Sequence, residues 1–304
     1  MWRLASRKHP SGPRHWEAHS LNLSGTQIEF MAPKQNHELI ERDETTSETL
    51  NIYGNQYFGR FDEADKHEPV ASGLVFRDWV FSGFLGRRIG DMKLQICVSK
   101  MPEFVSLFRP RHLECAIERF IYASSYSPGI SGESRLHWTL RNCNNSAWVN
   151  YNLIGNPGFH NAEEVVGSVW HIPITDEHLL SVYFKEIIRI KNSRLHETYQ
   201  KLIEKVMSSF TIKLSEDAQR QKEAVQSQYP DEKLSEHLPP YEFETYPEID
   251  EYELAKQVSA RYNYEKPYKE LKPEILEEEE SQRRKVEEVR QRVLASHLRF
   301  RGSE

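Results

Sequence analysis

The sequence predicts an α+β fold, in which an antiparallel β-sheet packs with amphipathic helices and a charged, extended or helical C-terminal tail follows. Short stretches of alternating apolar and polar residues recur along the first 215 residues, as half-buried strands require. Two other segments of that region place their apolar residues on a single helical stripe. All six Trp lie before Ser215, and the chain after it is rich in Glu, Lys, Pro and Tyr. Strands interrupted by helices, then a polar tail, indicate this class.

Charge divides the chain at the same place. Residues 216–304 hold 22 acidic and 15 basic side chains, a net charge of −7, whereas the whole chain carries −6. The first 215 residues are therefore nearly neutral. We expect a flexible basic N-terminus over residues 1–16, an α+β globular domain over 17–215, an arm rich in Pro, Tyr and Glu over 216–276, and a charged amphipathic helix over 277–301.

The first half of the domain predicts strands and one helix. Residues 19–31 indicate two short strands around a Ser24-Gly25 turn, and residues 33–49 are polar enough to predict a loop. Two further strands, rich in aromatic and β-branched residues or alternating in polarity, are expected over residues 73–84 and 93–99, with glycines 83 and 86 in the turn between them. The helix covers residues 112–122, and its apolar stripe consists of Leu113, Ala116, Ile117, Phe120 and Ile121.

The second half of the domain predicts a meandering antiparallel sheet. Its strands alternate in polarity, are separated by polar turns, and cover residues 136–141, 148–154, 165–174 and 179–188. A second amphipathic helix follows over residues 195–207, with Asn192 or Ser193 able to cap its start. Residues 210–214 alternate again and predict a last short strand.

The tail carries three weaker structural signals. Residues 216–228 could extend as a helix before the prolines at 230, 239, 240 and 247 interrupt it. Residues 241–246 alternate aromatic residues with acids, as a strand added at a sheet edge does. Residues 277–301 begin with four glutamates and end with arginines, an order that complements the helix dipole. The apolar stripe of that helix is narrow, which suits docking on a partner or pairing in a homodimer.

Several classes of protein are disfavoured by composition. No apolar run approaches the roughly 18 residues of a membrane-spanning helix, and the basic N-terminus has no apolar stretch behind it, which argues against secretion. The three cysteines, Cys97, Cys115 and Cys143, have no CxxC spacing and predict reduced thiols in the cytoplasm. No Lys/Arg stripe indicates a nucleic-acid partner, and no phosphate loop, catalytic triad or zinc motif predicts a cofactor, a metal or a catalytic residue.

The densest group of potential metal ligands is His171, Asp176, Glu177 and His178. Alternation places His171 on a strand face and residues 176–178 in a turn, so we favour a β-turn with polar strand ends. A metal-dependent or small-ligand enzyme that uses His171 and His178 remains an alternative. His112 and Cys115 lie one helical turn apart, but no orienting group or oxyanion site accompanies them, and a cysteine flanking the core is favoured.

Aromatic residues are the candidate partner-binding residues. Five lie on successive predicted strands, where they either pack in the core or line a concave face that grips a partner segment; they are Trp138, Trp148, Tyr151, Trp170 and Tyr183. Seven more recur between the prolines of the tail and would act as anchors; they are Tyr241, Phe243, Tyr246, Tyr252, Tyr262, Tyr264 and Tyr268.

The order of elements resembles that of a known superfamily. The turn and strand WHIPITDEHLLSVYF, residues 170–184, precede a long amphipathic helix that ends in KVMSSFTIK, residues 205–213. This pattern over residues 17–214 is similar to PsbP-like domains, a group that includes the Eag-type chaperones of bacterial secretion-system effectors. The resemblance implies an antiparallel sheet between helices and a non-enzymatic scaffold whose sheet face or edge holds a protein segment. The extra residues between 34 and 73 and the long tail depart from that pattern.

These observations favour a cytoplasmic, non-enzymatic protein-binding adaptor or chaperone. Its aromatic sheet face and its acidic, aromatic tail would hold a partner segment, such as part of a secreted effector. An accessory subunit of a large assembly, with the tail as an ordered arm, is the second interpretation.

Overall fold

The computed structural model describes residues 10–36, 47–54, 70–83, 86–101, 104–125, 134–154, 162–238 and 241–242. The chain divides into two compact units, one of Met1–Met101 with Ser106–Phe243, the other of Pro102–Val105 with Glu244–Glu304. The fold described below is that of the first unit. The predicted tail anchors Phe243, Tyr246, Tyr252, Tyr262, Tyr264 and Tyr268, and the predicted helix over 277–301, lie outside the described residues.

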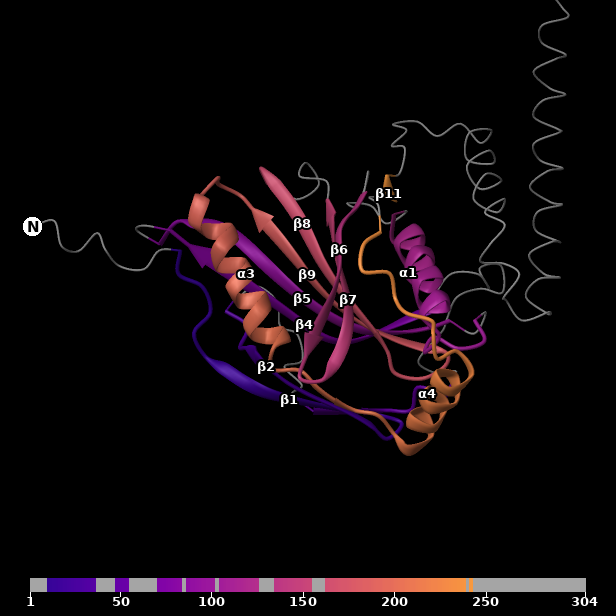
Figure 1. The fold of residues 1–304 in the computed structure, drawn as a ribbon. Helices are drawn as coiled ribbons and strands as arrows, with labels where there is room; N and C mark the ends of the chain where they lie inside the picture. Colours follow the sequence, from indigo (N-terminus) through magenta and orange to yellow (C-terminus); the bar gives the residue numbers. More distant parts are fainter. Residues whose placement is uncertain are drawn as a thin grey trace, which may run out of the picture. The chain divides into compact units, whose positions relative to one another are not determined.

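The predicted α+β class is confirmed. Seven strands form an antiparallel sheet in the order β11-β6-β7-β8-β9-β5-β4 (Figure 1). In chain order these strands are β4 (Val70–Ser82), β5 (Arg88–Lys100), β6 (Ser134–Cys143), β7 (Ser146–Ile154), β8 (Glu164–Pro173), β9 (His178–Ile188) and β11 (Tyr241–Glu242). The helices of the described residues are α1 (Pro110–Ser125), α3 (Ser193–Met207) and α4 (Glu216–Gln228).

A second, smaller sheet joins the two ends of the domain. Its order is β10-β2-β1-β3, with bounds Trp16–Leu23 for β1, Thr26–Pro33 for β2, Ser47–Leu50 for β3 and Thr211–Lys213 for β10. Strand β3 pairs in parallel with β1, so the predicted loop over 33–49 is corrected at its end. Strand β10, predicted as the last strand of the domain, pairs with β2 near the start of the chain.

Two tight turns have the backbone that their residues favour. Ser24 and Gly25 have φ values of 50° and 94° in the β1–β2 turn, as predicted from the sequence. Asn144 and Asn145 join β6 to β7 with φ values of 44° and 65°. Asn tolerates this left-handed region better than most residues. The Asn144 side chain donates hydrogen bonds to two carbonyls just after α3, so the turn also ties the larger sheet to that helix.

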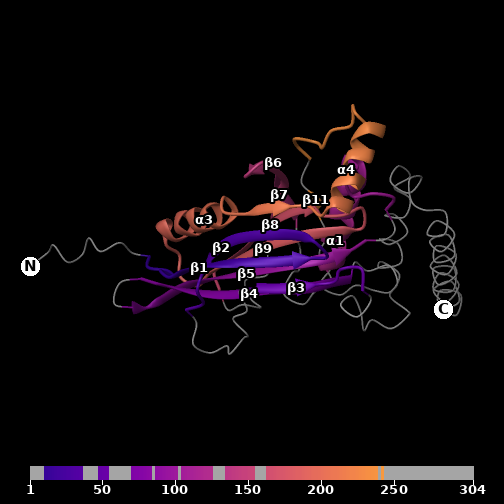
Figure 2. The same ribbon diagram turned by 90° about the horizontal axis from the view of Figure 1, so that it is seen from below.

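The larger sheet buries its two faces in different ways. We call the face that carries Trp170, Ile172 and Val182 the inner face, because it packs in one apolar cluster with the smaller sheet and α3. The other, outer face carries His171, Ser181 and Tyr183, since successive side chains of a strand alternate. The views in Figures 1 and 2 agree that α3 lies beside β2, whereas α1 lies at the opposite end of the sheet.

Helix α1 covers part of the outer face. Its apolar stripe is buried at Leu113, Ala116, Ile117 and Ile121, which confirms the predicted amphipathic helix. The ring of Phe120 packs edge-on against His171, with 5.0 Å between ring centroids. This helix and the outer face therefore form a second core, separate from the inner one.

The chain after Ser215 continues along this unit. Ser215 caps α4 by accepting a hydrogen bond from the Ala218 N–H, and Glu216 and Asp217 lie in the first turn of the helix. The predicted helical extension over 216–228 is thus confirmed. The Asp176 N–H donates to the Gln221 side chain, which attaches α4 to the β8–β9 turn. Further on, β11 pairs with the edge strand β6, which confirms the start of the added strand predicted over residues 241–246. Residues 243–246 lie outside the described residues. No helix among the described residues is long and apolar enough to cross a membrane.

Candidate partner-binding face

The five aromatic residues of the sheet that the sequence suggested for partner binding lie on two different faces of the sheet. Trp148 and Tyr151 are fully buried, Trp138 is 2% exposed and Trp170 is 7% exposed. Trp148 and Trp170 lie in the inner core, whereas Tyr151 lies on the outer face and stacks with Trp138. Of the two interpretations of these aromatics, packing in the core therefore holds for Trp138, Trp148, Tyr151 and Trp170. They do not form one partner-binding face, because residues 148 and 151 are an odd number apart and point to opposite faces.

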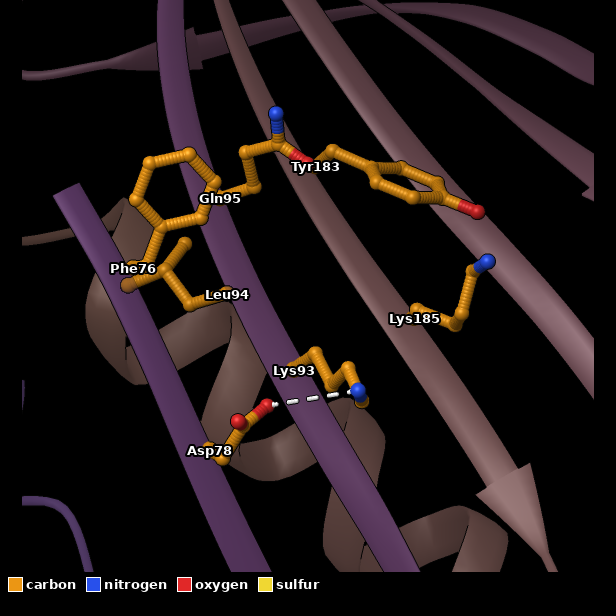
Figure 3. Close-up of a pocket in the computed structure, with 7 residues that line it drawn as sticks. All are labelled: Phe76, Asp78, Lys93, Leu94, Gln95, Tyr183 and Lys185. Atoms are coloured by element: carbon orange, nitrogen blue, oxygen red, sulfur yellow. Dashed lines mark ion pairs between the residues drawn. The ribbon is translucent and has the colours of Figure 1, made fainter. Parts of the chain in front are cut away.

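Tyr183 is the exception, since its side chain is only half-buried on the outer face. It borders a hollow of about 200 Å³ on strands β4, β5 and β9 (Figure 3). We call this feature the hollow; its lining residues are Phe76, Asp78, Lys93, Leu94, Gln95, Tyr183 and Lys185.

Strand register builds the hollow from two cross-strand rows. Gln95 of β5 lies opposite both Phe76 of β4 and Tyr183 of β9. One step along the same face, Lys93 lies opposite both Asp78 and Lys185. One row therefore consists of the Phe76 ring, the Gln95 amide and the Tyr183 ring, and the row beside it consists of the charged side chains of Asp78, Lys93 and Lys185. Figure 3 shows the side chains of both rows on the same side of the strands.

A glycine gives Tyr183 its position. Gly167 of β8 lies opposite Lys185, and a Cβ on it would come within 2.5 Å of the Tyr183 ring. The ring thus leans across β8 into space that only glycine leaves open.

The charged side chains of the hollow contact one another or an aromatic ring. The Lys93 ammonium lies 3.8 Å from the Asp78 carboxylate, with the Lys93 side chain 49% exposed. The Lys185 ammonium lies 5.8 Å from the centre of the Tyr183 ring, within the range of a cation–π contact. The side chains that line the hollow include two lysines and one aspartate, so their summed formal charge is positive. Such a surface suits a ligand that presents an apolar or aromatic group together with a carboxylate.

His171 takes part in a buried polar chain on the outer face. Its Nε2 lies 2.9 Å from the Tyr151 hydroxyl, and its Nδ1 lies 2.8 Å from the Ser181 hydroxyl. Burial lowers the pKa of His171 to about 3 and raises the pKa of Cys97, which hydrogen-bonds Ser181, to about 12. A neutral imidazole and a protonated thiol make this chain a hydrogen-bonded part of the core.

His178 has other partners than His171. Its Nδ1 lies 2.7 Å from the Thr175 hydroxyl, and its ring meets Tyr53 edge-on at 5.5 Å. The Thr175 hydroxyl also accepts hydrogen bonds from the Glu177 and His178 N–H groups. The turn predicted over residues 176–178 is confirmed at residues 176 and 177, whereas His178 is already the first residue of strand β9. Burial is the main reason that the pKa of His178 is lowered to about 4. Among the described residues, no group of three or more His, Cys, Asp or Glu side chains is arranged to hold a metal ion.

Sequence reasoning missed six of the seven residues of the hollow. Alternation along residues 73–84 and 93–99 shows which residues share a face of one strand, but not which strands are neighbours. Since β4 and β5 are distant in sequence from β9, the pairing of Gln95 with Tyr183 has no local signal.

Comparison with known proteins gives no family for this chain. No protein-family model and no curated protein matches it. Among solved structures, the apo structure of the immunity protein TplEi of the T6SS from Pseudomonas aeruginosa is similar over 70% of this chain and 81% of that chain. The two share 9% sequence identity and the TM-score is 0.26, so we draw nothing about fold or function from the likeness.

Proposed function

We propose that this protein is a non-enzymatic adaptor or chaperone that holds a segment of a partner protein in the hollow. The observation that carries this function is the row Phe76–Gln95–Tyr183 beside the row Asp78–Lys93–Lys185 on a half-exposed sheet face. Large rings that remain accessible next to charged groups are typical of the anchoring centres of protein interfaces. An aromatic or apolar side chain of the partner fits between Phe76 and Tyr183, with an acidic neighbour beside Lys185.

The role agrees with the resemblance to PsbP-like domains, in which a sheet face or edge holds a protein segment. Membership of that group is part of the proposal, as is residence in the cytoplasm. The thiols of Cys97, Cys115 and Cys143, none in a disulfide, are consistent with a reducing compartment.

A matched pair of variants tests the hollow. We expect Tyr183→Ala/Lys185→Glu to reduce capture of the partner from the native host at least about tenfold, because a buried anchor contributes about 2 kcal/mol or more. Tyr53→Ala is the control, since it removes a tyrosine that is 48% exposed and lies outside the hollow. Quantitative mass spectrometry of affinity-purified full-length chains provides the measurement. Identical partner sets for all three proteins would falsify this function.

The acidic, aromatic tail is the second part of the proposed interaction. Deleting residues 244–304 removes five of the seven predicted tail anchors, keeps Tyr241 and Phe243, and leaves β11 in place. We expect the truncated chain to retain its thermal midpoint but to capture the partner several-fold less well. Equal capture by the two chains would remove the tail from the interaction and leave the hollow alone.

A further inference from the structure

A segment of the chain is held on α1 and β6, on a surface separate from the hollow. The residues that follow α4 contact Arg109 immediately before α1, Glu114 on α1 and Trp138 on β6. We call these three residues the α1–β6 site. Its ligand in this structure is the sequence YPDEKLS, residues 229–235.

Arg109 binds two side chains of that segment. Its guanidinium bonds both carboxylate oxygens of Glu232, at 2.6 Å for Nη2–Oε1 and 3.0 Å for Nε–Oε2. The same guanidinium lies 4.0 Å from the centre of the Tyr229 ring. A bidentate arginine–carboxylate pair and a cation–π contact both depend on geometry, so they select a tyrosine followed by a glutamate three residues later.

Glu114 and Trp138 bind the backbone of a single residue. The Ser235 N–H donates to Glu114 Oε1 at 2.6 Å, and the Ser235 carbonyl accepts from Trp138 Nε1 at 2.8 Å. Side chains that bond both polar groups of one residue hold an extended segment without reading its side chain. The only requirement at this position is an N–H group, which proline lacks.

The sequence contains this pattern a second time. Tyr-x-x-Glu-Lys occurs at residues 229–233 and again at 262–266, where the residue that corresponds to Ser235 is Tyr268. Tyr-x-x-Glu also occurs at residues 183–186, but these lie within strand β9 and Glu186 is fully buried. The copy at residues 241–244 places Pro247 at the position of Ser235. Of the remaining copies, residues 262–268 therefore supply a natural match and residues 241–247 a natural mismatch.

We propose that the α1–β6 site is a second binding site, for an extended segment of a partner protein that has the pattern Tyr-x-x-Glu-x-x-X, where X is any residue except proline. Residues 229–235 occupy it as an internal ligand that a partner segment displaces. A partner segment seated there can continue as an added strand on β6, where Tyr241 now pairs with Arg135. This site shares no residue with the hollow.

Fluorescently labelled peptides test the site on the full-length chain. The probe has the sequence of residues 260–270, and the two controls are the same peptide with Glu265→Gln and a peptide of residues 239–249, which carries Pro247. The chain is used as wild type and as Glu232→Gln/Glu265→Gln, in which residues 229–235 and 262–268 each lack the carboxylate of the pattern.

We expect the probe to bind the doubly substituted chain at least about tenfold more tightly than wild type, since the internal ligand no longer competes. Both control peptides should bind at least about tenfold more weakly than the probe. Adding Arg109→Lys to the doubly substituted chain should abolish this selectivity, because lysine keeps the charge but not the bidentate geometry.

Circular dichroism establishes that each variant is folded. Equal binding of the three peptides, or no binding to the doubly substituted chain, overturns the proposal. Dimerisation of the Glu232→Gln/Glu265→Gln chain that excludes the probe would identify a second copy as the occupant and likewise overturn it.

Discussion

Gly90 lies at a place where other groups come too close for any side chain. A Cβ on Gly90 would collide with the Tyr199 hydroxyl and lie 2.7 Å from the Ile187 carbonyl oxygen. Since one of these atoms belongs to the backbone of β9, the surroundings of Gly90 cannot simply move aside.

We expect Gly90→Ala to lower the free energy of unfolding by about 1–3 kcal/mol, the usual cost of overpacking a core. Gly54→Ala is the control, because the nearest atom to its added Cβ is 3.4 Å away. Urea unfolding of both variants measures the difference, and equal stabilities would show that the β5–β9 strands separate at little cost.

We expect a substitution of Gly167 to affect partner binding more than stability. Its added Cβ would meet the outer end of the Tyr183 ring, which can rotate into solvent. We expect Gly167→Ala to change the free energy of unfolding by less than about 1.5 kcal/mol while weakening capture of the partner, because the ring leaves the hollow. Thermal melts and quantitative pull-downs measure the two effects. A variant that binds like wild type would show that the orientation of Tyr183 is unimportant.

The buried Glu186 carboxyl group predicts a loss of stability as pH rises. Glu186 has no exposed surface, and it accepts hydrogen bonds from the side chains of His196 and Gln200. Burial raises the pKa of Glu186, and the hydrogen bond to Glu186 raises the pKa of His196, with Glu164 as a further nearby charge acting in the same direction. The folded state therefore retains protons that the unfolded state releases.

This contribution is fully present below the ordinary pKa of each group and is lost as pH rises through the raised folded value. We expect the free energy of unfolding to fall as pH rises above the ordinary pKa values of Glu186 and His196, and to fall less in Glu186→Gln, which no longer titrates. Denaturant unfolding at a series of pH values from acidic to alkaline is the measurement. Parallel pH curves for the two proteins would contradict the coupling of Glu186 with His196.

Helix α4 is attached to the body through one small apolar side chain and several polar ones. Ala218 is fully buried, whereas Ala224 on the same helix is exposed. We expect Ala218→Glu to release α4, because a carboxylate at that position would be buried without a partner at a cost of several kcal/mol, roughly 3–5. Ala224→Glu should have little effect.

Limited proteolysis measures this difference, since release of α4 also exposes the backbone of residues 229–238. Rapid cleavage within those residues is expected in Ala218→Glu only. Equal resistance of the two variants would show that the contacts of Arg109 and Trp138 hold the segment independently of α4.

The elements show how far local sequence determines this fold. Period-two alternation located β5, β7, β8 and β9, and the apolar stripes located α1 and α3, because these signals are contained within single segments. Strand β3 was missed because its four residues, SETL, lie in a polar stretch and show no alternation of their own. They form a strand because they pair with β1. The hollow was missed for the same reason, since its two rows exist only once β9 lies beside β5.

Aromatic residues show the limit of composition as a guide to function. Trp138, Trp148, Tyr151 and Trp170 have the same chemistry as Tyr183, but alternation and the cover of α1 place them in the core. Arg109 is a candidate binding residue that composition did not suggest. Its partner Glu232 lies more than a hundred residues away in the sequence, so no local pattern marks the pair.

Three neutral histidines make the whole molecule sensitive to acid. Burial is the main cause that lowers the pKa of His19 to about 4, of His171 to about 3 and of His178 to about 4. Charged neighbours face two of them: Arg77 and Glu17 lie beside His19, and Lys100 and Glu177 lie near His178. Below pH 6.5 the unfolded chain binds protons at these positions that the folded chain does not.

We expect the free energy of unfolding to fall by up to about 1.4 kcal/mol per pH unit for each histidine as pH drops from 6.5 toward the lowered values. Urea titrations at pH 7, 6 and 5 measure the slope. His171→Gln, which keeps two hydrogen-bonding groups, should reduce it by about one third. An unchanged slope in that variant would mean that His171 is protonated in the folded protein.

The pairing of β10 with β2 sets a time order for synthesis. When β2 leaves the ribosome, its neighbour β1 has been made but its other neighbour, β10, has not. The Phe210 ring, which stacks on Phe30 at 4.6 Å between ring centroids, is also still missing. At about 5–20 residues per second, translation from residue 33 to residue 211 takes on the order of 10 to 40 s. The nascent hairpin therefore leaves the exit tunnel with an unpaired edge, and the smaller sheet can close only after residues 211–213 have been made.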